Sequence, residues 1–508
     1  MKKTKLLAIN MLIGAAAVLA FSGCKKFLDR QPLSSTVNDT QVGALESPTL
    51  GLYGALRNSA AEPFVGDGMQ NIPWLAMNGF RSDDAEIVAD PGATAWHQTY
   101  DNFQYVKDDW GAGLYWDKHY AMINLCNDII VKAEEENLTD DASMKNVAEA
   151  KFWRAYTYFE MVRTFGDIPK IDFKINSPTD AQIAKSSSDD IYAFIIEDLT
   201  FASNTLPVEW LDFPGRATSG AARTLLAKVN LYQQNWGATL SLCEAVINSN
   251  HYTLVPDYYT IFKTSGELNA ESILEIQAEK TSGDANIYWS RFGQTQGIRG
   301  AGGTEWDLGW GWNTPTTALV NSYESGDKRK DATILVSGQS DGGITTGGYG
   351  KTLPALSNAQ YWNKKVYNTY DEYIARGLGL PNNESQNTWV NYRALRYSDV
   401  LLMAAEAANE IGGSPNTDSA ETWVNRIRNR AGLPDITYTT QTAMRDEIKK
   451  QRRAEFAMEM ERFFDLVRWG DADAVLAPLG YQHRNRYYPI PTGALNANPN
   501  LVQNPDYP

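Results

Sequence analysis

Apolar side chains recur three and four residues apart over much of the chain, and this spacing predicts a mostly α-helical protein. The clearest stretches are residues 51–60, 115–137, 142–166, 189–207, 219–252 and 395–413. The fourth stretch opens with a helix-capping residue and stops at Pro207, and the fifth predicts two helices that join near residues 233–236. Strand character is limited to short pieces such as ESILEIQA (271–278) and RYYPIP (486–491).

Two of the predicted helices have the side-chain spacing of the second helix in a tetratricopeptide hairpin. The two sets are Ala238, Leu242 and Ala245, and then Ala420, Val424 and Ile427. Small side chains at such positions let helix axes approach closely. The repeats are degenerate and not in tandem, so an irregular helical bundle is the alternative. We predict a mostly α fold in which tetratricopeptide-like helix pairs form a right-handed scaffold.

A long irregular segment interrupts the helical pattern. Fifteen of the 39 glycines lie within residues 283–350, where helical spacing is lost. The segment also contains Trp289, Trp306, Trp310 and Trp312. Segments of this length without helical order are uncommon unless they bind something, so this glycine- and tryptophan-rich insertion is the best candidate for function.

The first residues have the arrangement of a secretion signal. Three lysines within the first five residues precede an uncharged run over residues 6–23, and Cys24 follows directly after Ser22 and Gly23. Small residues before such a cysteine resemble a lipoprotein processing box, although Phe21 stands where leucine is more frequent. Cleavage would leave Cys24 as the lipidated first residue of the mature chain.

The charge of the chain excludes two classes of partner. The sequence has 46 basic and 61 acidic residues, and loss of the signal removes three lysines and no acid, which changes the net charge from −15 to −18. Such a protein repels nucleic acids and anionic lipid surfaces, so acyl chains must attach it to a membrane. Cys126 and Cys243 lie in helical segments outside any CxxC pair and predict buried free thiols. The four histidines have no zinc-ligand spacing.

The stretch EMERFFDLVRWGD (459–471) crowds charged and aromatic residues together. On one helix the charged residues three or four apart would form a ladder along one side, namely Arg452, Glu455, Glu459, Arg462, Asp465 and Arg468. The remaining sides would carry Phe456, Met460, Phe463, Phe464 and Val467. An exposed charged pair stabilises by about 0.2–0.5 kcal/mol and a buried phenylalanine by about 1.5–3 kcal/mol, so core packing should hold this helix.

Arginines on both sides of an acid favour its permanent ionisation, which argues against a general acid in this ladder. We therefore expect the ladder to be structural, with Gly470 as a left-handed helix cap.

The segment RRAEFAMEMERFFDLVRWGD, followed by YYPIPTGALNANPNLVQNPDYP at the C-terminus, resembles the closing part of the SusD/RagB family of outer-membrane nutrient-binding lipoproteins. Further stretches agree in the same order, namely CKKFLDRQPLS, FWRAYTYFEMVRTFGDIP, DLTFASNTLP, ATSGAARTLLAKVNLY, LRYSDVLLMAAEA and NRIRNRAGLP. The resemblance covers essentially the whole mature chain. Its motifs belong to the scaffold and not to the ligand site.

The resemblance implies a cell-surface protein, anchored in the outer membrane by lipid at Cys24, that closes as a lid over a SusC-type TonB-dependent transporter and captures oligosaccharides. Capture of peptides, as in RagB-type lids, is the alternative. The expected organisation is a signal peptide (residues 1–23), a lipidated tether (24–41), a SusD-like N-terminal helical part (42–252) and a RagB/SusD C-terminal part (253–508) with the ligand-binding insertion at about 263–394, all in one compact fold.

Sugar recognition needs flat aromatic faces together with polar side chains that bond hydroxyl groups. The stretches GATAWHQTY (92–100) and IYWSRFGQTQGIRGAGGTEWDLGWGW (287–312) offer this mixture. The candidate ligand-binding residues are Trp96, Trp289, Arg291, Trp306, Asp307, Trp310, Trp312 and Trp362. Tryptophans in loops also occur as satellite core, and Trp116, Trp153 and Trp423 in the helical stretches are expected to be core.

Two other classes of protein were weighed against this prediction. A surface glycoside hydrolase needs two carboxyl groups about 5–5.5 Å or about 6.5–9.5 Å apart, which Asp83 with Asp84 or Glu305 with Asp307 would have to supply. A two-lobed solute-binding lipoprotein would alternate strands and helices, and this sequence does not. We predict no enzyme and no cofactor. The acidic loop SDGG (340–343) could bind calcium, but it lacks the ligand spacing of an EF-hand.

Overall fold

The computed structural model describes residues 44–57, 68–87, 95–279, 290–299, 304–343, 348–378 and 388–507. Its α-helices are α3 (Glu46–Ala55), α4 (Ile72–Gly79), α5 (Ala95–Asp101), α6 (Trp110–Glu135), α7 (Asp141–Phe165), α8 (Ser188–Thr205), α9 (Ser219–Tyr232), α10 (Trp236–Asn248), α11 (Phe292–Gln296), α12 (Thr317–Ser322), α13 (Lys328–Thr333), α14 (Tyr370–Ala375), α15 (Tyr397–Ile411), α16 (Asn416–Arg430), α17 (Gln441–Phe456), α18 (Arg462–Trp469), α19 (Ala472–Leu476) and α20 (Thr492–Ala497). The predicted mostly helical fold is confirmed.

Strands are few and short in the described ranges. They are β1 (Ala85–Glu86), β2 (Ser272–Ile276), β3 (Thr314–Pro315), β4 (Ile334–Val336), β5 (Tyr361–Asn363) and β6 (Tyr392–Arg396). They form the antiparallel pairs β1–β3, β2–β6 and β4–β5. The predicted strand in residues 271–278 is β2, whereas the strand predicted in 486–491 is wrong. Pro489 and Pro491 have no N–H for a ladder, and the N–H of Ile490 bonds the Gln503 side chain instead.

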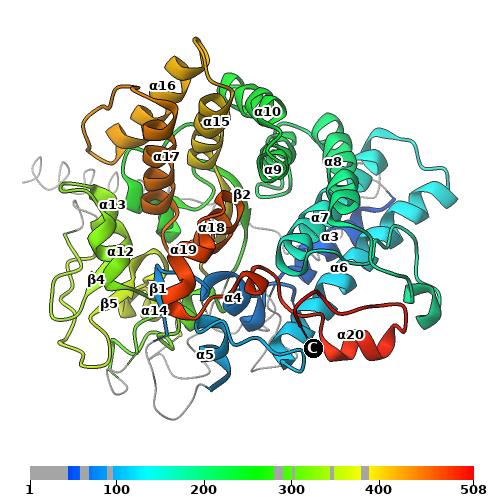
Figure 1. Ribbon diagram of the computed structural model, residues 1–508, viewed down its shortest axis with the longest axis horizontal. Coiled ribbons are helices and arrows are strands. Elements are labelled where there is room, and N and C mark those ends of the chain that lie inside the picture. The colour runs from blue at the N-terminus through cyan, green and yellow to red at the C-terminus, as the bar shows by residue number, and fades with distance from the viewer. Residues whose placement is uncertain are drawn as a thin grey trace, which may run out of the picture.

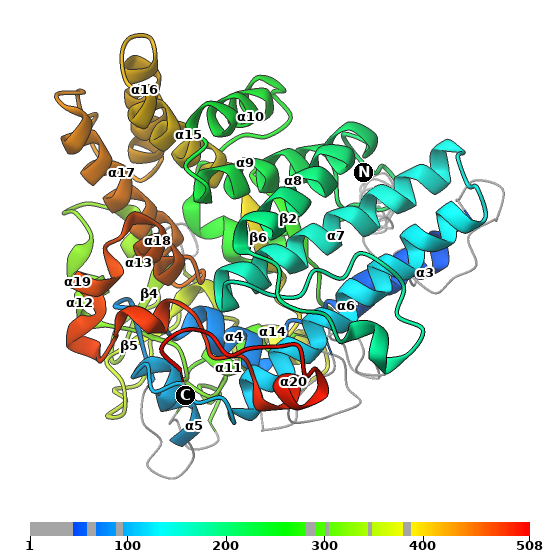
Figure 2. The same ribbon diagram turned by 45° about the vertical axis from the view of Figure 1, so that its right-hand side comes forward.

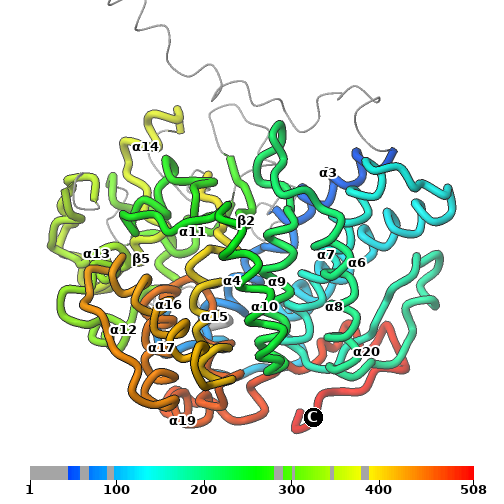
Figure 3. Tube along the Cα trace, turned by 90° about the horizontal axis from the view of Figure 1, so that it is seen from above, coloured from blue at the N-terminus to red at the C-terminus, as the bar shows by residue number. Residues whose placement is uncertain are grey.

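The helices form one array whose members pack on their neighbours in sequence from α6 to α10. Helix α10 then packs on α15, which comes more than 140 residues later, and α16 and α17 follow α15. Figures 1 and 3 show this row of helices, with the insertion elements α12, α13, β4 and β5 at one side. The two helical regions predicted from the sequence are therefore continuous in space.

Local sequence sets the ends of the long helices. The Asp109 carboxylate accepts the Gly111 N–H at 2.7 Å at the start of α6, and Asp140 accepts the Ser143 N–H at 2.9 Å at the start of α7. Helix α7 ends at Gly166, whose φ of 75° favours glycine. A Cβ at this position would also lie 3.0 Å from the Tyr487 ring, so the helix end packs closely against the C-terminal segment.

The main hydrophobic core lies between the helices and includes the predicted core residues Trp116, Trp153 and Trp423. The predicted buried free thiols, Cys126 and Cys243, are also confirmed. The insertion has a second core of its own, which contains Ile298, Trp306, Leu308, Leu335, Leu353, Trp362, Tyr367, Tyr373 and Trp389. Because these apolar contacts hold it together, the described part of the insertion is packed around a core although it has little regular secondary structure.

The tetratricopeptide-type spacing holds for one predicted set and shifts by one residue in the other. Ala420, Val424 and Ile427 are all fully buried. In α10, however, the exposed residues include Ala238 and Ala245, and the side chains that pack inward are Thr239, Cys243 and Val246. This second set has the same spacing of four and three residues. The spacing of apolar and small residues alone therefore does not show which of the two sets is buried.

The predicted charge ladder does not lie on one helix. Helix α17 ends at Phe456 and α18 begins at Arg462, and between them Met458 and Met460 have left-handed φ values of 66° and 67°. The break moves the ladder residues into the interior. There Arg396 donates to Glu271 at 2.7 Å, to Glu455 at 3.0 Å and to Glu459 at 2.9 Å.

A second arginine, Arg430, also bonds Glu271 and Glu455, which completes a buried ion-pair network. Burial would raise the pKa of Glu455, but Arg430, Arg396 and Arg329 together hold it well below its usual range. The expected ionisation of the ladder acid is confirmed. Gly470 ends α18 in the left-handed conformation, as predicted. None of the helices in the described part of the chain is both long and apolar enough to cross a membrane.

Candidate functional site

Two stretches of the insertion are held side by side by backbone hydrogen bonds. The N–H of Trp310 donates to the Gln294 carbonyl at 2.8 Å, and the N–H of Trp312 donates to the Thr295 carbonyl at 2.9 Å. A Cβ at Gly309 would lie 2.5 Å from the Cα of Gly297, so only glycine permits this approach of the two chains. The backbone therefore fixes the positions of both tryptophans.

The two tryptophans form an aromatic cluster with a residue from a distant part of the sequence. The ring centroids of Trp310 and Trp312 are 4.4 Å apart, and the His97 ring of α5 lies 3.8 Å from that of Trp312. Trp312 is buried, whereas Trp310 is partly exposed. The Arg291 guanidinium carbon lies 5.7 Å from the Trp310 ring centroid. We call these four residues the Trp310 surface.

The predicted stretches 92–100 and 287–312 thus meet in space, as the contact between α5 and Trp312 shows. Figure 2 shows α5, α11 and α4 along the lower side of the molecule. The side chain of Trp96 and the whole of Trp289 lie outside the described residues. His97, which makes the contact, was not among the predicted ligand residues, because a single histidine next to a tryptophan carries no distinctive signal.

Arg291 supplies charge beside the Trp310 ring. Its side chain is 4 % exposed, and burial lowers its pKa to about 10, which still leaves it protonated at neutral pH. It donates to the Gln294 side chain at 2.6 Å. Arg291 thus places a buried positive charge, held by the Gln294 side chain, beside the Trp310 ring.

A small cavity of about 20 Å³ adjoins Arg291, between α4 and α11. Gln70 and Asn71 line it, and their side-chain N–H₂ groups are buried with no hydrogen-bond partner within the described ranges. The cavity holds about one water molecule. Sequence reasoning missed both residues, because short polar residues before a helix are normally caps, and Asn71 does cap α4 through the Trp74 N–H at 3.0 Å.

The remaining candidate residues of the insertion lie deeper. Trp362 is fully buried, donates to the Ser337 hydroxyl at 3.0 Å and belongs to the second core. Trp306 is 9 % exposed and stacks parallel to Tyr367 at 6.2 Å. In this conformation both rings are packed into the second core, and neither has an open face for a sugar. Asp307 is partly exposed beside Trp306.

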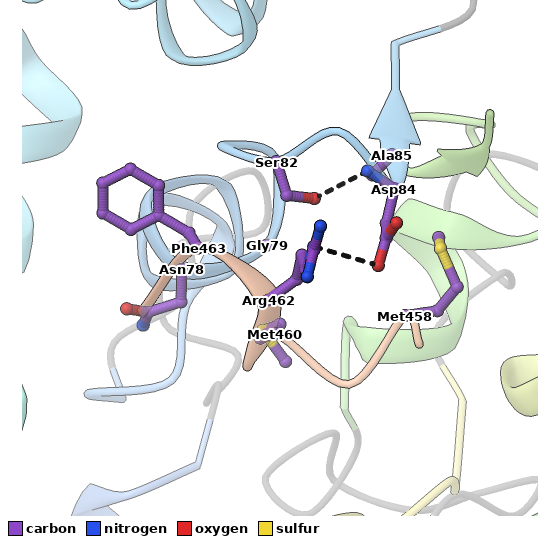
Figure 4. A pocket seen from close by; sticks show the side chains of 9 residues that line it. All are labelled: Asn78, Gly79, Ser82, Asp84, Ala85, Met458, Met460, Arg462 and Phe463. Carbon is purple, nitrogen blue, oxygen red and sulfur yellow. Dashed lines mark hydrogen bonds and ion pairs between the residues drawn. The ribbon is translucent and has the colours of Figure 1, made fainter. Parts of the chain in front are cut away.

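The carboxyl pair Asp83 and Asp84 shows why a hydrolase is disfavoured. Arg462 donates to Asp83 at 2.8 Å, and Arg453 donates to Asp83 at 2.8 Å and to Asp84 at 2.7 Å. Burial raises the pKa of Asp84, whereas at Asp83 the effect of burial is outweighed by Arg462 and Arg453, which lower the pKa. Two neighbouring carboxyl groups whose pKa values shift in opposite directions also occur in catalytic pairs. Yet the cavity beside Asp84 (Figure 4) measures about 10 Å³, which admits a water molecule and no sugar ring.

The SDGG loop uses its acid within the fold. Asp341 is buried and accepts the backbone N–H groups of Tyr349 at 3.2 Å and Lys351 at 2.9 Å, as well as the Tyr367 hydroxyl at 3.1 Å. Within the parts of the chain that the structure describes, no three histidine, cysteine, aspartate or glutamate side chains gather in a way that suits a metal ion. Asp341 therefore has a structural role that needs no calcium.

We expect Asp101→Asn to stabilise the protein at pH 8. Asp101 ends α5, the helix that holds His97 on Trp312, and burial with a contribution from Glu86 raises its pKa to about 7. The unfolded value is about 3.9, so this carboxyl costs stability progressively as the pH rises from about 4 to about 7. The amide removes the cost, roughly 1–2 kcal/mol after solvent screening, so urea unfolding should show a gain at pH 8 that shrinks at pH 4.5.

The exposed Asp212 is the matched control for this measurement. Asp212→Asn should leave the free energy of unfolding unchanged at both pH values. An equal gain for Asp101→Asn at pH 4.5 and pH 8 would contradict the role of its carboxyl charge.

Comparison with known proteins identifies the fold. A model described as "SusD family" matches residues 270–484, and one described as "Starch-binding associating with outer membrane" matches residues 64–231. The two matched segments together span well over half of the chain. They also divide between the N-terminal helices and the part that contains the insertion.

Whole-length relatives agree with this result. The chain is 28 % identical to SusD-like protein P2 of Formosa agariphila over 100 % of both chains. It is 25 % identical to a SusD superfamily protein of Bacteroides vulgatus, with a TM-score of 0.73 over 90 % of this chain and 97 % of the other. It is also 25 % identical to a laminarin-binding SusD-like protein, with a TM-score of 0.74 over 91 % and 98 %. That description is of binding and not of a reaction, in agreement with the prediction that no bond is made or broken. This chain belongs to the SusD family.

Proposed function

We propose that the protein is a cell-surface glycan-binding lipoprotein that captures oligosaccharides for uptake. The observation that carries the proposal is the Trp310 surface, where a partly exposed indole adjoins a buried, protonated arginine on a rigid backbone. Relatives of similar length that are described as binding laminarin support a glycan as the ligand class. The starch-binding description of the matched N-terminal model supports it as well.

The Trp310 surface suits one or a few sugar rings. The exposed face of Trp310 would stack on the C–H side of a pyranose, which buries apolar area worth about 25 cal/mol per Å². Arg291 would bond ring hydroxyls, and we propose Trp96, Trp289 and Asp307 as further contacts at the same edge. Trp306, Trp312 and Trp362 would hold the platform in place. Ordering of ligand and loops costs part of the gain, so single sites should bind in the micromolar to millimolar range, as an order of magnitude.

We propose that the protein acts at the outer membrane as the lid of a SusC-type TonB-dependent transporter, with Cys24 as its lipid anchor. Cys24 and residues 25–41 lie outside the described residues, so this step rests on the sequence and on the description of the matched family model, which names association with the outer membrane. The acyl chains would hold the lid beside the barrel. Ligand released by the lid would then be recaptured at high local concentration.

Calorimetric titration with laminarihexaose and maltohexaose would test the glycan proposal. We expect the parent to bind at least one of them and Trp310→Ala to weaken that binding at least about tenfold, which corresponds to about 1.4 kcal/mol. The matched control is Trp110→Ala, which removes a tryptophan that is 42 % exposed at the start of α6. The control variant should bind like the parent.

Two outcomes would contradict this proposal. Equal binding by Trp310→Ala and Trp110→Ala would exclude the Trp310 surface as the platform. A steady release of reducing ends from either oligosaccharide by the parent would favour a hydrolase instead.

A further inference from the structure

A second and larger concavity lies away from the Trp310 surface. It has a volume of about 580 Å³ and is formed by α7, α8, α9 and α18 together with residues 483–487 and 504–507. The C-terminal segment that forms one wall is tied to α7, because the Asn504 side chain donates to the Phe165 carbonyl at 2.8 Å. Five basic residues line the concavity, namely Arg163, Lys185, Arg468, Arg484 and Arg486. We call it the arginine groove.

Three of these basic side chains are not neutralised by a carboxylate. Lys185 donates to the Asn504 side chain at 3.0 Å, Arg484 donates to the Asp506 carbonyl at 3.1 Å, and Arg486 donates to the Tyr487 hydroxyl at 2.7 Å. Across the described residues, no ion pair joins any of the three to an acid. This contrasts with the buried arginines of the core, such as Arg154 and Arg452, which are paired with aspartates.

Two of the five basic residues are neutralised by acids behind the groove, since Arg163 pairs with Glu160 and Arg468 with Glu406 and Asp465. The cations that remain, Lys185, Arg484 and Arg486, share the lining with Asp167, Asp189 and Asp506. Asp167 already accepts the N–H and the hydroxyl of Ser188, each at 2.8 Å. Three cations without a carboxylate partner in one concave surface stand out on a chain whose net charge is −15, and they offer positions at which an anionic group can bind.

Polar atoms of residues that line the groove also lack partners. The Tyr232 hydroxyl and the Nε atoms of Arg163 and Arg486 are buried without a hydrogen-bond partner in the described part of the chain. Unsatisfied buried donors are costly. These atoms lie behind the surface of the groove, so its open hydrogen-bonding groups are the side chains of Lys185, Arg484 and Arg486.

Three of the aromatic rings that line the groove, Phe464, Tyr487 and Tyr507, have a guanidinium group over one face. Arg163 lies 4.0 Å from the Phe464 ring centroid, and Arg486 lies 4.5 Å from that of Tyr487. Arg484 stacks more loosely on Tyr507 at 5.5 Å. Sugar rings need open aromatic faces, and at these three rings a guanidinium group occupies one face. A stacked guanidinium instead keeps its N–H edge available, and this edge matches a carboxylate.

We propose that the arginine groove binds an extended polypeptide segment rich in glutamate and aspartate. The covered rings favour an acidic peptide over an acidic glycan, and the volume lies within the range of small-ligand sites, about 300–1,000 Å³. The segment must come from another molecule. The tether of this chain, residues 25–41, carries Lys25, Lys26 and Arg30 against Asp29 and Asp39, so it is not acidic.

Fluorescence anisotropy with labelled eight-residue peptides would test this proposal. The probes are alternating Glu-Gly, Gln-Gly and Lys-Gly sequences, with an oligogalacturonate of similar charge as the acidic glycan. We expect the Glu-Gly peptide to bind at least tenfold more tightly than the other probes. Its affinity should fall by a further factor of about ten for Arg484→Glu with Arg486→Glu, and it should weaken as salt is raised.

The matched control is Lys132→Glu with Lys450→Glu, which makes the same change of charge at side chains 47 % and 45 % exposed elsewhere. This control should keep the affinity of the parent. If the double variant of Arg484 and Arg486 does not fold, Arg484→Glu alone, at an exposed position, should show part of the loss of affinity. Equal binding of the Glu-Gly and Gln-Gly peptides, or an equal loss in the control, would overturn the proposal. Tighter binding of oligogalacturonate would assign the groove to acidic glycans instead. Oligosaccharide binding at the Trp310 surface should not change in any of these variants, so the two proposals fail independently.

Discussion

Replacement of Arg396 by methionine is expected to lower the free energy of unfolding by about 3–5 kcal/mol, because it leaves buried acids without their main partner. Arg396 is 2 % exposed and bonds Glu271 together with Glu455 and Glu459, which lie more than 180 residues later in the chain. Arg430 would remain with Glu271 and Glu455, Arg329 with Glu455 and Lys365 with Glu459, but none of these cations replaces the bonds that Arg396 makes to all three acids. Urea unfolding followed by tryptophan fluorescence would measure the change.

The control for this substitution is Arg445→Met. Arg445 pairs with Glu410 in a similar bidentate geometry at 2.7 Å, but its side chain is 33 % exposed, so the loss should be about 0–1 kcal/mol. Similar losses in the two variants would show that burial of the Arg396 network adds nothing to its contribution.

The loss at Arg396 should also depend on pH in a defined direction. The pKa of Glu455 is depressed in the folded protein, so its ion pairs contribute stability above the unfolded value of about 4.3, and this contribution is lost as the pH falls. The difference between the parent and Arg396→Met should therefore be largest near pH 7 and shrink below about pH 4.5. A difference that grows in acid would contradict this assignment of charge.

Loss of the cysteine at position 24 is expected to remove nearly all of the protein from the outer membrane. The test joins a cleavable, non-lipoprotein secretion signal to residues 24–508 with Cys24→Ala, and compares cell fractions and incorporation of labelled palmitate with those of the parent. Each buried CH₂ of an acyl chain contributes about 0.8 kcal/mol, so several chains hold the parent firmly and the variant should be released. The acidic surface offers no substitute attraction to anionic lipids.

Cys126→Ala and Cys243→Ala are the matched controls, because both cysteines are buried and free. These variants should keep the label and stay in the outer-membrane fraction. If the Cys24→Ala protein remained there in the same amount, the proposed anchor would be wrong.

The helical scaffold was predictable from the sequence because its signals are local. Helix period and the left-handed stop at Gly470 depend on residues within one or two turns, and the observed helices α6 to α9 follow the predicted period closely. The insertion was also recognisable as irregular from its glycines and tryptophans. Even so, a period alone did not distinguish between the two possible buried faces of α10.

The candidate site was predictable only in its neighbourhood. Residues 92–100 and 287–312 do meet, but which tryptophan is open depends on contacts far apart in sequence. Trp362 is closed over by the second core, whereas Trp310 is only partly covered. Composition cannot separate these two cases, because burial is a property of all the surrounding chain.

What the sequence by itself determined about this protein is the kind of scaffold, its family resemblance and the two segments that hold the candidate site. Only the tertiary structure decided that α10 packs on α15 and that the ladder acids lie in a buried network around Arg396. It also decided that Arg484 and Arg486 line a groove and pair with no acid among the described residues. The reason is physical. Helix formation is governed by neighbours three and four residues apart, whereas burial and charge pairing are set by residues that the sequence separates by tens to hundreds of positions.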